Sequence, residues 1–145
     1  MQNELIKEQV PAFVLAGNAT ITLQSGATGR HFTYRIKKYK DQNVYFIRTL
    51  RGPDNENDYT YIAAYYPARN RLHISKQWYG MPEDTWPPSV RAINYLFEHL
   101  HDKPERLHVF HEGRCGRCGR LLTTPESIQS GYGPECINFV GGKHA

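Results

Sequence analysis

The three cysteines of the 145-residue chain lie close together, at positions 115, 118 and 136. Cys115 and Cys118 form a Cys-x-x-Cys pair followed by Gly119, and such a turn brings two sulfurs to one point because glycine permits its tight backbone. Cys136 follows Gly133 and Pro134, a sequence typical of the entry to a helix. Three thiolates and one nitrogen or oxygen form the closed tetrahedral donor set of structural zinc. The spacing therefore predicts a structural Zn²⁺ site.

The fourth ligand of this predicted site has several candidates. Our first choice is His111, four residues before Cys115. A catalytic zinc is not expected, because three thiolates resist activation of a bound water and no His-x-Glu precedes the cysteines. A redox-active cysteine pair is not favoured either, since no βαβ pattern surrounds it. The alternative fourth ligands are His108 and His144, followed by Glu112 and Glu135.

The stretch from His111 to Cys136 resembles the carboxy-terminal motif of an uncharacterised protein family that is common in bacteriophages and mobile elements. It reads HEGRCGRCGRLLTTPESIQSGYGPEC. The family pattern is H-x-x-x-C-x-x-C-G-R-x-L-T-x-P-x-S-I-x-x-G-x-G-P-x-C. The resemblance implies a zinc ligand at each of His111, Cys115, Cys118 and Cys136, and it implies a viral origin. It implies no established activity.

The upstream sequence is typical of an α+β fold. From Ala12 onward the pattern favours strands, and the alternation of apolar and polar residues is clearest at 19–24 and 31–39. Apolar residues at three- and four-residue steps from Val90 to Leu100 predict one helix packed on a sheet face. The even spacing predicts an antiparallel meander of about five strands. The five expected strands are 19–24, 31–39, 44–50, 59–66 and 71–78.

Two units are expected along the chain. Residues 1–105 would form the antiparallel sheet with its helix, and residues 106–145 a small zinc-knuckle module of treble-clef-like type. The second unit includes one short strand at 107–110 but few large apolar side chains. A segment of about forty residues lies near the limit for folding without a metal or a crosslink.

Basic residues concentrate between positions 30 and 51, with Asp41 as the only acid there. Aromatic residues alternate with the cations at 30–40, and a positive sheet face with exposed rings suits single-stranded nucleic acid. The alternative is a solvated face whose Phe32, Tyr34 and Ile36 simply belong to the core. The predicted nucleic-acid-binding residues are Arg30, Arg35, Lys37, Lys38, Lys40, Arg48 and Arg51, with Arg117 and Arg120 of the zinc module.

Tyrosine is abundant, with ten residues in the chain. Period-two alternation places Tyr59, Tyr61 and Tyr65 on one strand face and Tyr66 on the other. Because tyrosine also favours protein interfaces, a protein partner competes with nucleic acid as an interpretation.

Composition narrows the functional classes. The longest apolar run spans only residues 12–16, too short for a membrane span, and the amino terminus lacks a secretory pattern. An odd cysteine count makes a disulfide framework unexpected. We expect a protein of the cytoplasm, the host cytoplasm if it is viral.

No nucleophile elbow, phosphate loop or paired carboxylates appear, so a binding protein is favoured over an enzyme. The leading hypothesis is a phage-type accessory protein that binds single-stranded DNA or RNA. The alternative is an inhibitor or adaptor that binds a host protein complex, such as a viral anti-defence factor.

Overall fold

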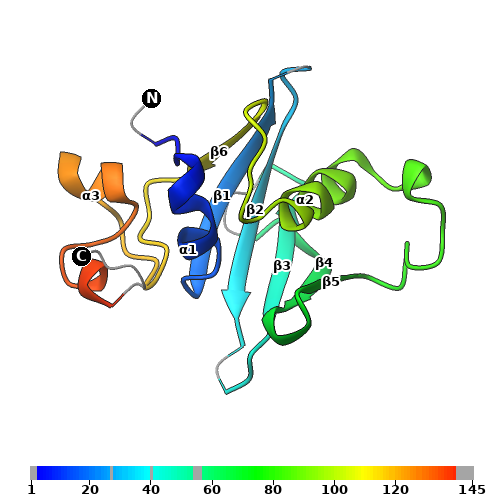
Figure 1. Cartoon of the computed structure of the whole chain (residues 1–145), viewed down its shortest axis with the longest axis horizontal. Coiled ribbons are helices and arrows are strands. Elements are labelled where there is room, and N and C mark those ends of the chain that lie inside the picture. The colour runs from blue at the N-terminus through cyan, green and yellow to red at the C-terminus, as the bar shows by residue number, and fades with distance from the viewer. Residues whose placement is uncertain (1–2, 27, 40, 54–56, 140–145) are drawn as a thin grey trace.

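Six antiparallel strands form one sheet in the order β5-β4-β3-β2-β1-β6 (Figure 1). The computed structural model describes residues 3–26, 28–39, 41–53 and 57–139. The α+β class is confirmed, and the sheet has one strand more than predicted, because residues 107–111 pair with β1. The strands are β1 (Asn18–Ser25), β2 (His31–Lys38), β3 (Tyr45–Leu50), β4 (Tyr59–Tyr66), β5 (Arg71–Ile74) and β6 (Leu107–His111).

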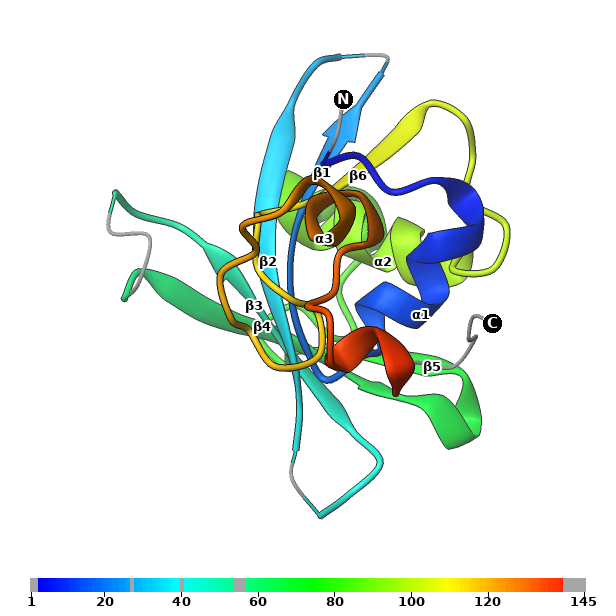
Figure 2. The ribbon, with the colours of Figure 1, turned by 90° about the vertical axis from the view of Figure 1, so that its left-hand side faces the viewer.

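Two helices cover one face of this sheet, α1 (Val10–Val14) and α2 (Pro88–Glu98) (Figures 1 and 2). The stripe predicted for α2 is confirmed, since Val90, Ile93 and Leu96 are fully buried. The Tyr34 hydroxyl of β2 donates to the Ser89 carbonyl, which fixes the first turn of α2 on the sheet. The remaining helical segments are η1 (Lys7–Gln9), η2 (Pro67–Arg69), η3 (Glu83–Thr85), α3 (Pro125–Ser130) and η4 (Cys136–Asn138).

The α1 segment corrects the strand expected from Ala12 onward. Pro11 lies in its first turn, where the fixed φ of proline favours a helix. Val10, Phe13 and Val14 follow the three- and four-residue steps of a helix face, and all three are fully buried. The described part of the chain contains no helix with the length and apolar character that a membrane crossing requires.

A β-bulge in β4 corrects the predicted faces of the tyrosines. Ile47 of β3 pairs with Ala63, whereas Arg48 pairs with Tyr61, so Ile62 is an extra residue on β4. The extra residue reverses the alternation beyond it. Tyr65 therefore lies on the buried face, 3% exposed, and not on the face of Tyr61.

The chain after β6 packs on α1 and β1 (Figure 2). Phe13 of α1 contacts Gly116 and Gly131. A Cβ atom would lie 2.6 Å from the Phe13 ring if built on Gly116 and 2.8 Å from it if built on Gly131. The Asn18 amide of β1 donates to the Gly116 carbonyl at 2.8 Å. The predicted second unit, 106–145, thus begins with a strand of the sheet, and its described residues up to 139 continue against the same core.

A Gly116→Ala substitution tests this packing. The new methyl group would overlap the fully buried Phe13 ring, and we expect a loss of about 1–3 kcal/mol in the free energy of unfolding by urea. Gly133→Ala is the matched control, because its Cβ would meet no atom within 4 Å. Equal stability of the two variants would contradict the described contact with Phe13.

Candidate metal centre

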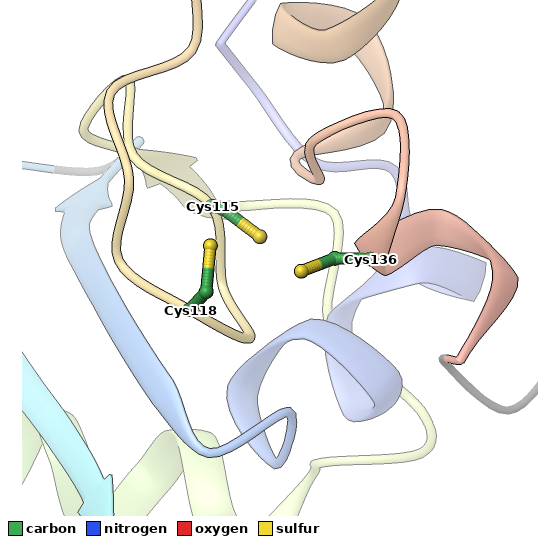
Figure 3. Close-up of side chains that lie close together, drawn as sticks. All are labelled: Cys115, Cys118 and Cys136. Atoms are coloured by element: carbon green, nitrogen blue, oxygen red, sulfur yellow. The ribbon is translucent and has the colours of Figure 1, made fainter.

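The sulfur atoms of Cys115, Cys118 and Cys136 point toward a common centre and lie within 4.8 Å of one another (Figure 3). All three cysteines are free thiols, with Cys115 and Cys136 buried and Cys118 exposed. A tetrahedral zinc ion with bonds of about 2.3 Å holds its sulfurs roughly 3.8 Å apart, so this spacing suits a metal. The cluster could hold a metal ion.

Two short segments bring these sulfurs together. The Cys115 amide donates to the Arg120 carbonyl at 2.8 Å, and the Gly119 amide donates to the Cys115 carbonyl at 2.8 Å. This tight turn needs glycine at 119, where φ is +80° and a Cβ would lie 3.0 Å from the Asn18 side chain. Cys136, the first residue of η4, supplies the third sulfur from the other segment.

Backbone amides stabilise the thiolate form of Cys115. Burial alone raises the pKa of this thiol, but N–H groups of Cys118, Gly133 and Arg117 donate to its sulfur, and the net pKa is lowered. A thiolate held by N–H donors is the form that binds a metal. The local backbone therefore favours coordination at this sulfur.

Arg117 lies beside Cys136. Its guanidinium is 3.6 Å from the Cys136 sulfur and stacks over Phe139, 4.4 Å from the ring centroid. Burial raises the pKa of Cys136, and the Arg117 contact opposes that rise. Arg120 is exposed on the same turn. The contact of Arg117 and Arg120 with nucleic acid stays a prediction.

His111 is not a member of the three-sulfur cluster. It is 1% exposed, its Nδ1 accepts from the Gly113 amide at 3.0 Å, and its Nε2 donates to the Ile128 carbonyl. These bonds tie the end of β6 to α3 and use both ring nitrogens. A metal-binding His111 would have to give up one of these two hydrogen bonds.

Among the described residues, none of the alternative fourth ligands belongs to the three-sulfur cluster. His108 pairs with Glu4 at 2.6 Å, and Glu112 accepts a hydrogen bond from the Thr22 hydroxyl. Glu135 is exposed at the start of η4, and His144 lies outside the described residues.

Tyr132 is a residue of this region that sequence reasoning missed. Its hydroxyl is buried and has no hydrogen-bond partner among the described residues. Burial raises the pKa of Tyr132 far above its ordinary value, and the charge of the nearby Cys115 is a second, smaller cause. The centroid of its ring lies 5.6 Å from that of Phe13, so the tyrosine packs against α1 beside Cys115. The one feature of the sequence that could have indicated this role is the position of Tyr132 between Gly131 and Gly133.

The structure divides the predicted basic residues between several locations. Arg35, Lys37 and Arg48 lie on the sheet face opposite α1 and α2, the open face, which also carries Thr20, Thr22 and Tyr61. Arg30 is on the helix-covered side, in a pocket with α2 residues. Lys38 and Arg51 are exposed at strand ends, and Lys40 lies outside the described residues.

Comparison with protein families gives a match over part of the chain. Residues 105–137 match the model of a family of unknown function, DUF6011. The matched segment contains β6, the three cysteines and α3, so the similarity to an uncharacterised family falls on the candidate metal centre. No curated protein and no solved structure matches the chain.

Metal content of two variants tests the donor set. We expect Cys136→Ala to lose the bound metal, because it removes one of three sulfurs within 4.8 Å. We expect His111→Gln to keep one metal per chain while losing about 2 kcal/mol of stability, because a buried residue with two backbone bonds is altered. Elemental analysis of the folded proteins measures the first effect and urea unfolding the second. Folded His111→Gln without metal would show instead that His111 is a ligand.

Proposed function

We propose that the protein is a zinc-containing, phage-type accessory protein that binds single-stranded DNA or RNA through the open face of its sheet. In this proposal a structural zinc ion binds Cys115, Cys118 and Cys136. Thiolate donors favour zinc among the common divalent ions, and the Cys-x-x-Cys turn with the first turn of η4 suits a treble-clef-like centre. The zinc ion would hold the segment after β6 against α1.

A pair of like charges on the open face carries the proposal. Arg35 of β2 and Arg48 of β3 are directly opposite each other across the two strands. Two guanidinium groups at directly opposed positions concentrate positive charge on this face, which attracts the phosphates of a nucleic acid. Arg35 also stacks over Tyr59, 4.3 Å from the ring centroid, and Lys37 follows on the same face of β2.

Aromatic rings continue this face beside the cations. Phe46, opposite Lys37, contacts Tyr39 at 5.7 Å and Tyr61 at 6.1 Å, both edge to face. Tyr39 is 51% exposed and Tyr61 40%, so both rings are accessible to a ligand. Bases of a single strand stack on such rings while cations follow the phosphates. Cations and rings on one sheet face support nucleic acid over a protein partner.

A charge-reversal variant tests this function. We expect Lys37→Glu/Arg48→Glu to bind a fluorescent oligothymidylate at least about tenfold more weakly than the wild type. The plot of the logarithm of the binding constant against the logarithm of the salt concentration should become shallower, by roughly 0.7 in slope for each lost phosphate contact. Fluorescence anisotropy across a salt series measures both quantities. Lys76→Glu is the matched control, because Lys76 is exposed in the loop after β5.

Stacking is tested separately with Tyr61→Ala. Loss of one stacked base weakens binding by about 1–3 kcal/mol without changing the salt dependence. Wild-type affinity in both the double variant and Tyr61→Ala would reject the open face as the binding surface. A protein partner retained from nuclease-treated lysate by the wild type but not by these variants would assign the face to a protein.

A further inference from the structure

A basic pocket lies on the helix-covered side of the sheet, opposite the open face. It is bounded by the β1–β2 turn, α2 and the segment before β6, and its volume is about 460 Å³. Arg30, Arg91 and Arg106 line it, one from each of these three parts of the chain. Of these arginines only Arg30 belongs to the basic stretch recognised in the sequence.

The backbone around these arginines is fixed by hydrogen bonds. The Ser25 amide donates to the Arg30 carbonyl at 3.0 Å, and the Gly26 amide donates to the Arg106 carbonyl at 2.7 Å. Gly26 allows this approach, because a Cβ there would lie 3.0 Å from the Arg106 carbonyl oxygen. Arg91 lies on α2, whose first turn Tyr34 holds on β2. The three positions are therefore preorganised.

The pocket carries an excess of positive charge. Among the described residues that line it, Glu83 is the one acid, against three arginines. Among the described residues, no carboxylate forms an ion pair with any of these guanidinium groups. Guanidinium groups recognise phosphate through paired N–H donors, so a phosphate group matches this excess.

Apolar and aromatic side chains form the rest of the wall. Phe32 and Tyr95 line the pocket together with Pro88 and Pro104. The Arg30 guanidinium lies 5.6 Å from the Phe32 ring centroid, so cation and ring are adjacent, and Tyr95 is 43% exposed. A volume of about 460 Å³ is within the range of roughly 300–1,000 Å³ found for small-molecule sites.

We propose that this pocket binds a nucleoside monophosphate group, with the base against Phe32 and Tyr95 and the phosphate held by Arg30, Arg91 and Arg106. The group belongs either to a free nucleotide or to the phosphorylated end of a strand. The site lies on the other side of the sheet from the open face and shares no residue with it. It therefore stands or fails independently of the function proposed above.

Isothermal titration of the 145-residue chain with each of the four nucleoside monophosphates tests the site. At least one should bind, and the corresponding nucleoside and inorganic phosphate should each bind at least about tenfold more weakly, since each lacks half of the group. Arg91→Glu/Arg106→Glu should weaken the nucleotide at least about tenfold, because it reverses two of the three phosphate-binding charges. Lys37→Glu/Arg48→Glu and Lys76→Glu should bind it as the wild type does.

Absence of binding by all four nucleotides, equal binding of nucleoside or of phosphate alone, or unchanged affinity in Arg91→Glu/Arg106→Glu would each overturn the proposal. Circular dichroism checks that this variant, altered at two exposed residues, remains folded. Oligonucleotides with a 5′-phosphate or a 5′-hydroxyl, titrated into Lys37→Glu/Arg48→Glu, distinguish the sources. A preference for the 5′-phosphate identifies a strand end as the ligand, and equal affinity identifies the free nucleotide.

Discussion

Convergence of three sulfurs is the constraint on which the segment after β6 depends. After β6 the described part of the chain has two short helical segments, α3 and η4, and it contacts Phe13 of α1 and Asn18 of β1. The cysteine cluster joins the turn at Cys115 to the start of η4. A metal there would supply the crosslink that so small a segment otherwise lacks. His111 adds a second tie, between β6 and α3.

The sheet gives the protein two surfaces of different character. Its open face is a shallow array of cations and rings that suits an extended strand, with Arg35 and Arg48 opposed across β2 and β3. On the other side, α2 and the β1–β2 turn border an open pocket of about 460 Å³ that suits a compact ligand. Both surfaces depend on the pairing of β1 with β2, which sets the positions of Arg30 and Arg35.

Much of the sheet was predictable because simple alternation places Ile21 and Ile36 in the core, as the structure confirms. Three features were not. The bulge at Ile62 reverses which side chains of β4 are buried, but the amino-acid pattern of the strand does not indicate it. The α1 helix is only five residues long, and the pairing of β6 with β1 joins segments about ninety positions apart. The cysteine cluster followed from spacing alone. Its surroundings did not, because Phe13 and Tyr132 reach it through tertiary packing.

The most direct measurement is native mass spectrometry of the purified protein, with hydrogen exchange before and after chelation. The account predicts one zinc ion per chain. It also predicts that chelation abolishes amide protection in residues 112–139 while the β1–β4 amides stay protected, because the ion crosslinks only that segment. A chain purified without metal whose residues 112–139 are already protected would contradict the account.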